Sequence, residues 1–366
     1  MGVISFARGV PAPECLPVSE LADCARAAIE RDGASVLSYG PGGGYAPLRE
    51  WIAARHGVEP SRVVITSGSL QGFVFLVEQL VKPGSRVLVE APTYDRPLKI
   101  LNRLGAEIVG LPMDDDGLQV DALERTLAAG EKPAFLYTIA TFQNPSGRTL
   151  STERRRRIAE LAREHELLVL EDDPYGLVRY EGEAPPTIFE LEGGTNVAYA
   201  SSFSKTIAPG VRVGYFVLPP ALAAQIEALA VSTYISPPFL TQAAVYEFVS
   251  RGLFEPNLER VTGLLGARRD AMLAALEEHM PEGATWSRPE GGYFIWLDLP
   301  HEAGDLLARA EAAGVTFVQG TDFFADGSGT RSLRLAFSFV SVDEIAEGVS
   351  RLAGLLRGAP APASTL

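Results

Sequence analysis

The sequence predicts an α/β protein, in which a large domain with a mostly parallel sheet between helices is followed by a smaller α+β domain. Apolar runs of strand length alternate with amphipathic stretches of helix length through the first two thirds of the chain, which is typical of βαβ units. From about Glu255 the pattern changes to long amphipathic stretches with only two strand-like runs between them. The length of 366 residues also favours two cores over one.

Seven apolar runs account for the strands of the predicted large sheet. Their continuous hydrophobicity indicates that both faces of the sheet are covered. Segments of helix length, such as 69–81 and 151–166, connect some of them. The predicted strands are 62–66, 86–90, 106–111, 134–139, 167–171, 196–200 and 211–218.

The smaller domain is predicted to contain a helix over 258–280, a strand in YFIWLDL, a helix over 302–313, a strand in RSLRLAFSF and a closing helix. We therefore predict four parts. They are an N-terminal segment over 1–30 that packs with the small domain, a ligand-binding large domain over 31–255, a small domain over 256–357 and a loose tail over 358–366.

Composition argues against several classes of protein. The net charge is −14, and the run of four arginines at 154–157 is expected to spread around a solvated helix face, so nucleic acid is not an expected partner. Two cysteines, Cys15 and Cys24, form neither a disulfide framework nor a metal motif, and we predict no metal site. Without a signal pattern or a membrane-spanning run, the sequence predicts a soluble, cytoplasmic protein with no membrane partner.

Lys205 lies in a short polar loop between two of the predicted strands, and Arg212 follows seven residues later. Burial and a nearby cation lower the pKa of a lysine amine, which then becomes a nucleophile able to form a Schiff base with an aldehyde. The planar fork of Arg212 suits a phosphate. Taken alone, a Ser-x-Ser-Lys stretch is much more often a solvated loop lysine beside a strand.

The loops after the other predicted strands carry polar groups at the sheet edge where α/β proteins bind ligands. Gly68, in SGSLQG, opens a helix whose first N–H groups suit an anion, and Tyr94, in APTY, could lie on a ligand ring. Asn144, in TFQNPSG, could donate to a ring oxygen. Asp172, in EDDPYG with Tyr175, could keep a pyridine nitrogen protonated and so make the ring an electron sink. Each loop could also be a plain turn.

The order of these motifs resembles that of fold-type I pyridoxal-phosphate (PLP) aminotransferases of class I/II. The motifs are GSLQ, PTY, NPSG, EDDPY, SFSK followed by Arg212, GGYFIW and SLRLAFS. The resemblance covers almost the whole chain and is closest to the alpha-aminoadipate aminotransferase group and the catalytic domain of MocR-type regulators. It implies that the large domain binds PLP, and that a Schiff base on Lys205 serves to move the amino group of an α-amino acid to a 2-oxo acid.

The resemblance also implies the residues of the site. In the family, matching residues make the Schiff base, hold the phosphate, face the ring nitrogen and phenolic oxygen, or stack on the ring. The expected cofactor-binding residues are Gly68, Ser69, Leu70, Tyr94, Asn144, Asp172, Tyr175, Ser202, Lys205 and Arg212, with Tyr39 reaching the phosphate of the neighbouring subunit of a homodimer. The expected catalytic residues are Lys205, Asp172 and Tyr175. The expected substrate-binding residues are Arg334, which clamps the carboxylate, Asn144 and Gly9.

Three features depart from the resembled group. The group usually has a helix ahead of the stretch that begins here at Ile4, so we expect a more open substrate mouth. Leu70 replaces a residue that is usually polar, which leaves backbone contacts to the phosphate intact. The loop FVQGTDFF differs from the group's usual proline and glycines. The specificity candidates are Asp95, Arg96, Gln319, Thr321 and Asp322. The two acids, Asp95 and Asp322, would suit a cationic substrate, or they are simply solvated surface charges.

Two other functions stay open at this point. A relative of the same fold could use the same carbanion for β- or γ-elimination, replacement, cyclisation or oxidation, since the motifs are shared. The chain could also be a sensory module like that of MocR-type regulators, although those proteins carry a winged-helix segment for which this sequence has no residues.

Overall fold

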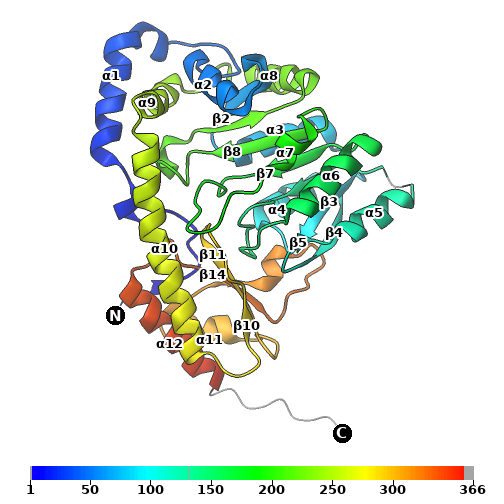
Figure 1. The fold of residues 1–366 in the computed structure, drawn as a ribbon, viewed down its shortest axis with the longest axis vertical. Coiled ribbons are helices and arrows are strands. Elements are labelled where there is room, and N and C mark those ends of the chain that lie inside the picture. The colour runs from blue at the N-terminus through cyan, green and yellow to red at the C-terminus, as the bar shows by residue number, and fades with distance from the viewer. Residues whose placement is uncertain (1, 131, 358–366) are drawn as a thin grey trace.

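The computed structural model describes residues 2–130 and 132–357. A large eight-stranded sheet flanked by helices forms one part of the molecule, and a four-stranded sheet packed against further helices forms a smaller part below it in Figure 1. The predicted class, an α/β large domain with a smaller α+β domain, is confirmed. The predicted loose tail, 358–366, lies outside the described residues.

The large sheet has the strand order β2-β9-β8-β7-β6-β3-β4-β5. Neighbouring strands from β8 to β4 run parallel, whereas β9 lies antiparallel between β2 and β8. The strands are β2 (Val63–Thr66), β3 (Arg86–Ala91), β4 (Glu107–Asp114), β5 (Gly117–Leu118), β6 (Phe135–Thr138), β7 (Val169–Asp172), β8 (Val197–Ser202) and β9 (Gly214–Val217).

The seven predicted strands are all present, but the sheet has eight, so the predicted number was wrong. The additional strand, β5, has two residues and pairs antiparallel with the end of β4. Gly117 has a φ of +89°, a conformation that favours glycine, and this allows the chain to turn back immediately after β4. A two-residue strand is too short to produce a recognisable hydrophobic period.

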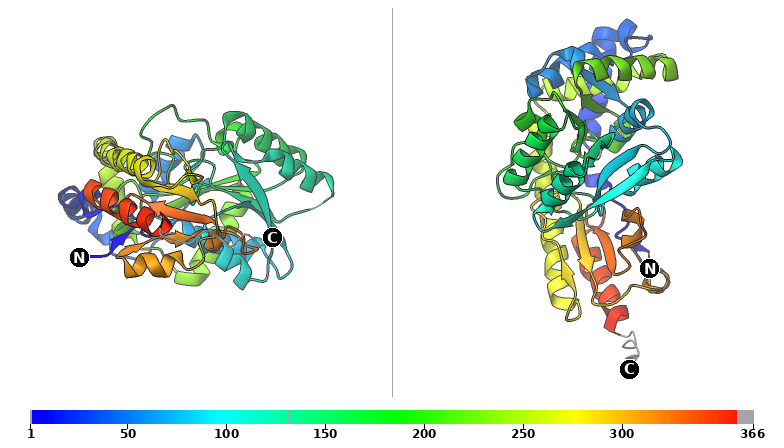
Figure 2. Two further views of the ribbon diagram at one scale, coloured as in Figure 1. Left: turned by 90° about the horizontal axis from the view of Figure 1, so that it is seen from below. Right: turned by 90° about the vertical axis from the view of Figure 1, so that its right-hand side faces the viewer.

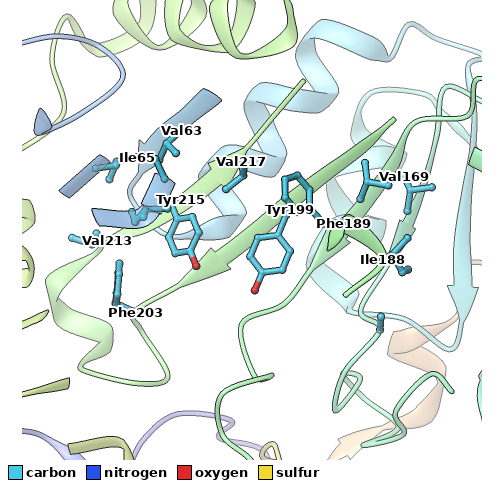
Figure 3. Packing of buried hydrophobic residues seen from close by; sticks show 14 of the residues in the cluster. Val63, Ile65, Val169, Ile188, Phe189, Tyr199, Phe203, Val213, Tyr215 and Val217 are labelled. Atoms are coloured by element: carbon cyan, nitrogen blue, oxygen red, sulfur yellow. The ribbon is translucent and has the colours of Figure 1, made fainter. Parts of the chain in front are cut away.

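Helices cover both faces of the large sheet. They are α1 (Val18–Val36), α2 (Ala46–His56), α3 (Ser69–Leu80), α4 (Asp95–Arg103), α5 (Val120–Ala128), α6 (Thr152–Glu164), α7 (Ile188–Glu192), α8 (Pro220–Tyr234) and α9 (Phe239–Ser250). Successive strand residues point to opposite faces, so Ile65 and Tyr199 belong to one core, shown in Figure 3, while Val64 and Ala198 belong to the other. Two buried faces explain why the strands read as continuous apolar runs.

The smaller part is built on the sheet β10-β11-β14-β13. Figures 1 and 2 show α10, in yellow, running from the large part down one side of the smaller one. The elements are β10 (Thr285–Trp286), β11 (Phe294–Asp298), β13 (Val318–Gln319), β14 (Ser332–Ala336), α10 (Phe254–His279), α11 (Leu306–Ala312) and α12 (Val342–Arg357). The helix predicted over 258–280 therefore begins one turn earlier, at Phe254.

The N-terminal residues divide their contacts between the two parts. The strand β1 (Ile4–Ser5) pairs in parallel with β12 (Val315–Thr316), next to the smaller sheet, whereas α1 packs along α9 on the large sheet. The exact domain limits stay a prediction. Within the described residues, no helix combines the length and the hydrophobicity needed to cross a membrane.

Candidate active site

The turn between β2 and α3 presents backbone N–H groups at the carboxyl edge of the large sheet. Gly68 has a φ of +90° and is followed by Ser69, the first residue of α3. The neighbouring strand β9 approaches this turn closely, since a Cβ on Gly214 would lie 2.6 Å from the Ser69 nitrogen. The first residues of α3, including Leu70, thus form a helix N-terminus of the kind that binds phosphate.

Arg212 and Ser202 lie beside this helix N-terminus. Arg212 has a φ of +51°, and its Nη2 donates to the Ser67 carbonyl over 2.5 Å. Ser202, at the end of β8, donates through Oγ to Ser204 Oγ over 2.9 Å. The structure therefore brings the predicted phosphate ligands together.

Lys205 lies in the loop after β8 and is partly buried. Its Nζ donates to the Gly9 carbonyl over 2.7 Å, and the rings of Tyr293 and Tyr175 have centroids 5.0 and 5.5 Å from it. Burial lowers the pKa of the Lys205 amine to about 8, with further lowering by the positive charges of Arg334 and Arg212. An amine with this pKa is neutral, and hence nucleophilic, at mildly alkaline pH.

Asp172 ends β7 with one carboxylate oxygen paired and one free. Its Oδ2 accepts a hydrogen bond from the Tyr137 hydroxyl over 2.9 Å. Its Oδ1 is buried and has no hydrogen-bond partner among the described residues. Burial raises the pKa of Asp172 to about 7. A buried acceptor without a donor is costly, so this oxygen is suited to a donor such as a protonated ring nitrogen.

Arg334, on β14, joins the smaller sheet to the site. Its Nη1 donates to Asn144 Oδ1 over 3.0 Å, and its Nη2 donates to the Ala7 carbonyl over 2.9 Å. The guanidinium lies 4.3 Å from the ring centre of Phe294 and 5.1 Å from that of Phe323. Its Nε is buried without a partner among the described residues. These apolar surroundings strengthen any ion pair that Arg334 makes with a carboxylate.

A buried hydrogen-bond network holds the loop that carries Asn144. Gln143 donates through Nε2 to Glu90 Oε2 over 3.0 Å and to the Pro92 carbonyl over 2.8 Å. Glu90 also accepts from Thr138 Oγ1 over 2.6 Å. Sequence reasoning missed Glu90 and Gln143, because nothing in an apolar strand ending in glutamate indicates which loop it will hold.

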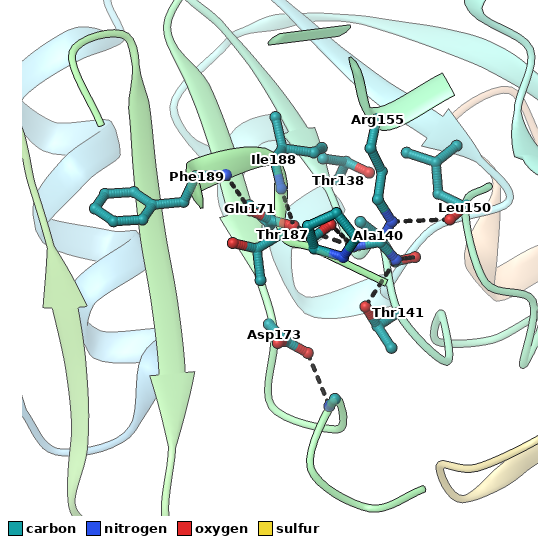
Figure 4. A network of polar contacts seen from close by, with 12 residues as sticks. Thr138, Ala140, Thr141, Leu150, Arg155, Glu171, Asp173, Thr187, Ile188 and Phe189 are labelled. Atoms are coloured by element: carbon teal, nitrogen blue, oxygen red, sulfur yellow. Dashed lines mark hydrogen bonds and ion pairs between the residues drawn. The ribbon is translucent and has the colours of Figure 1, made fainter. Parts of the chain in front are cut away.

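Arg155 corrects the prediction that the four arginines at 154–157 spread around a solvated face. Its side chain is fully buried and donates to the carbonyl oxygens of Ala140 and Leu150 over 2.6 and 2.8 Å. As Figure 4 shows, it lies near Glu171, whose carboxylate accepts from the backbone of α7 and is 3.6 Å from the guanidinium. On a helix, four consecutive side chains point in four different directions, and the side chain of Arg155 points into the protein.

Tyr94 and Tyr175 also lie in or beside the site. Tyr94 precedes α4 and is partly buried, and burial raises the pKa of its hydroxyl to about 12. Tyr175 is buried, with its ring 5.4 Å from that of Tyr293 and 5.7 Å from that of Phe294. Sequence reasoning missed Tyr137, whose hydroxyl donates a hydrogen bond to Asp172.

Some predicted residues lie away from this cluster or already have partners. Tyr39 has 82% of its surface exposed, in the loop between α1 and α2. The Asp95 carboxylate is 2.7 Å from Lys99 Nζ on the same helix, and its side chain is only 16% exposed, whereas Asp322 is exposed. Both negative charges act on the nearby guanidinium of Arg334 and favour its charged form, so the two acids stay candidates for specificity.

Comparison with known proteins identifies the family. The model of the family "Aminotransferase class I and II" matches residues 4–352. The chain belongs to this family. It is 39% identical to the 2-aminoadipate transaminase of Thermus thermophilus, over 98% of this chain and 91% of that one. It is 37% identical to aromatic-amino-acid aminotransferase 1 of Thermococcus litoralis, over 97% and 88% of the two chains.

A solved structure agrees with the whole fold of this aminotransferase. The kynurenine aminotransferase of Pyrococcus horikoshii, solved in complex with PMP, superposes with a TM-score of 0.94 and 37% identity, and the match covers 98% of this chain and 91% of that one. The protein is thus a PLP-dependent enzyme that transfers amino groups. Its own residues fit the cofactor, because the unpaired Asp172 Oδ1 suits a protonated ring nitrogen, and Arg212 beside the first residues of α3 suits a phosphate.

Proposed function

We propose that Lys205 is the nucleophile of this aminotransferase and that Arg334 binds the substrate carboxylate. One observation carries this assignment: both side chains donate to the same short segment, Lys205 to the Gly9 carbonyl and Arg334 to the Ala7 carbonyl. The proposed nucleophile and the proposed carboxylate clamp therefore lie close together, although they come from different sheets.

Bound PLP supplies an aldehyde for an amine and a ring that stabilises negative charge at the substrate α-carbon. Asp172 Oδ1 would accept a hydrogen bond from the ring nitrogen and keep it protonated. Lys205 Nζ, once neutral, would remove the proton from the substrate α-carbon and later deliver it to the cofactor carbon on the other side of the amino nitrogen. Arg334 pairs with the α-carboxylate in a fixed plane, which determines the bond to the α-carbon that breaks.

The other predicted residues act in binding. Gly68, Ser69 and Leu70 offer backbone N–H groups to the phosphate, together with Ser202 and Arg212. In the same proposal, Asn144 and Tyr175 would donate to the phenolic oxygen and Tyr94 would stack on the ring, while Gly9 would line the substrate site.

The proposed amino donor is an aromatic amino acid or 2-aminoadipate, and the acceptor is a 2-oxo acid. The support is the substrate named for two relatives that are 37% and 39% identical over nearly the whole chain. The test is to incubate the protein and PLP with each donor and 2-oxoglutarate, and to follow glutamate formation by mass spectrometry. Release of ammonia or an altered side chain, without glutamate, would contradict transamination as the main reaction.

A second measurement tests Lys205 itself. Borohydride treatment of the wild-type holoenzyme should attach the cofactor covalently to the peptide containing Lys205. The Lys205→Ala variant should show no such peptide, while Lys99→Ala, which alters an exposed lysine on α4, should retain it. A labelled peptide elsewhere in Lys205→Ala would remove Lys205 from this role.

We also propose a cytoplasmic homodimer in which Tyr39 reaches the neighbouring subunit's site. Tyr39 lies in an exposed apolar patch with Leu37, Val231 and Ile235, whose exposed fractions are 82%, 66%, 43% and 62% in that order. The loop and the end of α8 are tied together, since the Gly40 nitrogen donates to Ser236 Oγ over 3.0 Å. A patch of this kind on a protein surface is typical of an interface. Both cysteines are free, in keeping with a reducing compartment.

A further inference from the structure

Asp173 directly follows β7, but its side chain has other surroundings than that of Asp172. Asp172 bonds to Tyr137, which belongs to one of the two cores of the large sheet. Asp173 Oδ2 accepts a hydrogen bond over 2.9 Å from the hydroxyl of Tyr199, which belongs to the other core. Neighbouring residues of an extended chain point to opposite faces of a sheet. Asp173 therefore does not share the site of Asp172, and the mechanism proposed above gives it no role.

Asp173 is buried, and each of its polar groups has a partner. Its Oδ1 accepts from the Gly176 nitrogen over 2.8 Å, which closes a tight turn (Figure 4). Its own nitrogen donates to the Ala200 carbonyl over 2.7 Å, and its carbonyl accepts from Ser201 Oγ over 2.8 Å. Together with the bond from Tyr199, these contacts fasten the turn to β8.

The backbone of this turn wraps closely around the carboxylate of Asp173. A Cβ on Gly176 would lie 2.5 Å from both carboxylate oxygens, so the turn has no room for a larger residue at this position. The carboxylate therefore fills the inside of the turn, and the turn keeps its shape only while the carboxylate is in place.

Tyr175 lies within the closed turn. Its carbonyl accepts from the Val178 nitrogen over 2.7 Å, and its ring centre is 5.4 Å from that of Tyr293 in the smaller part. Lys205 Nζ is 5.5 Å from the centre of the Tyr175 ring. Burial raises the pKa of Tyr175, so its hydroxyl stays a hydrogen-bond donor. The turn thus places a protonated phenol close to the proposed nucleophile.

We propose that Asp173 is the positioning residue of Tyr175. By closing the turn and fastening it to β8, Asp173 fixes the place of the Tyr175 side chain relative to Lys205, which follows the same strand. The inference rests on the proposed function, in which Tyr175 donates to the phenolic oxygen of PLP. Asp173 has no contact of its own in that proposal, and its effect on the reaction passes through Tyr175.

The pH dependence of the visible absorption of the holoenzyme tests this role. A phenolic oxygen that loses an external donor holds the proton of the Schiff base more strongly. Tyr175→Phe should therefore raise the midpoint of the absorption change by about one pH unit, the effect of one hydrogen bond to a charged group. Asp173→Ala should give at least half of this rise. The double variant should rise no further than Tyr175→Phe, because the two residues act through one contact.

Two further variants separate positioning from stability. Asp173→Asn should keep the wild-type midpoint, because an amide can still accept from Gly176 and can donate to the Tyr199 oxygen. The matched control is Glu192→Ala, at the end of α7. Glu192 is also a buried carboxylate that closes a turn, since its Oε2 accepts from the nitrogens of Thr195 and Asn196 over 2.7 and 3.1 Å. This variant should lose stability and leave the midpoint unchanged.

Hydrogen exchange of the Gly176 amide in the cofactor-free protein tests the turn without the cofactor. Exchange should be at least about tenfold faster in Asp173→Ala, which removes the acceptor, and should keep the wild-type rate in Asp173→Asn. If Tyr175→Phe itself leaves the absorption midpoint unchanged, the proposed contact of Tyr175 with PLP is wrong. The exchange rate of Gly176 then decides alone whether Asp173 fixes the turn.

Unchanged Gly176 exchange in Asp173→Ala would overturn the proposal. If Tyr175→Phe shifts the midpoint, a wild-type midpoint in Asp173→Ala, or a further rise in the double variant, would show that Asp173 does not act through Tyr175. An equal shift in Glu192→Ala would mean that any loss of stability moves the midpoint. If Asp173→Ala fails to fold, Tyr199→Phe decides instead, and an unchanged midpoint in that variant counts against the proposal.

Discussion

Lys205 shows at the scale of one residue how burial prepares an amine for chemistry. In the protein without cofactor, the pKa of Lys205 is lowered from 10.5 to about 8, mainly because the charged form is poorly solvated. Between these pH values the unfolded chain binds a proton that the folded chain does not. The free energy of unfolding therefore rises with pH across this window, and below pH 8 the cost of the charged amine is present in full.

We predict that Lys205→Met removes this dependence. Urea unfolding of the cofactor-free proteins at pH 7.5, 9 and 10.5, a window set by these two pKa values, should show the wild type gaining stability relative to the variant as the pH rises. The comparison with the variant cancels the titration of other groups. Parallel curves for the two proteins would mean that Lys205 has an ordinary pKa.

The contribution of Asp172 to the free energy of unfolding should change with pH in the opposite direction to that of Lys205. Without cofactor its pKa is raised from 3.8 to about 7, so the folded chain binds a proton that the unfolded chain loses over this range. The free energy of unfolding then falls as the pH rises from about 4 to 7 through this group. Asp172→Asn keeps an acceptor for Tyr137 but removes the buried charge.

We predict that cofactor-free Asp172→Asn is more stable than the wild type at pH 8. The same variant should exchange the substrate α-proton at least about 100-fold more slowly, because an amide does not stabilise a protonated ring nitrogen. Deuterium exchange measured by mass spectrometry provides the second readout. Unchanged exchange would remove Asp172 from the mechanism, whatever its stability.

At the scale of elements, Arg155 connects α6 to the loop after β6 and to β7. It reaches two carbonyl oxygens and the buried carboxylate of Glu171, which also caps the start of α7. Arg155→Met would leave that carboxylate without its cation. Breaking such a buried pair costs about 3–5 kcal/mol.

We therefore predict a loss of about 3–5 kcal/mol in the free energy of unfolding of Arg155→Met at pH 8, measured by urea denaturation. Its neighbour Arg156 is exposed, and Arg156→Met should change stability by less than about 0.5 kcal/mol. Equal effects of the two substitutions would show that the buried network contributes nothing specific.

At the scale of the whole molecule, the proposed dimer predicts how two inactive variants combine. Tyr39→Ala and Lys205→Ala should each be impaired. If Tyr39 serves the neighbouring subunit, a mixed dimer has one site with both residues intact and one with neither. After subunit exchange, up to half of the wild-type activity per mixed dimer should return.

The control pair is Asp172→Asn with Lys205→Ala, because both residues belong to one chain's site and no mixed dimer restores it. Native mass spectrometry establishes that exchange has occurred. Recovery in neither pair, with exchange complete, would mean that Tyr39 acts within its own chain. Recovery of activity in both pairs would show that Asp172 and Lys205 do not serve the site of the same chain, contrary to the proposal.

The sequence predicts this molecule well where a short pattern determines the geometry. Continuous apolar strands and the rule that ligands bind after them led to Asp172, Asn144 and Lys205. The structure places Asp172 at the end of β7 and the other two residues in loops that follow strands. Sequence patterns fail where a residue distant in the sequence determines whether a side chain is buried or what it bonds to. Arg155 can be buried because the buried carboxylate of Glu171 offsets its charge, and the carboxylate that accepts from Tyr137 is 35 residues away. No local period encodes either pairing.

The segment that contains Ala7 and Gly9 has a practical consequence for handling the protein. It hydrogen-bonds to both proposed reactive side chains, and the Phe6 carbonyl accepts from the Ala336 nitrogen over 2.7 Å. An exopeptidase that trims nine residues from this end would remove the acceptors of Lys205 and Arg334, together with the buried side chains of Ile4 and Phe6 in the core of the smaller part. Such a clipped protein would migrate on a gel almost like the intact one, yet it would be less stable and a poor catalyst. Activity per milligram, rather than purity on a gel, is therefore the proper measure of a preparation.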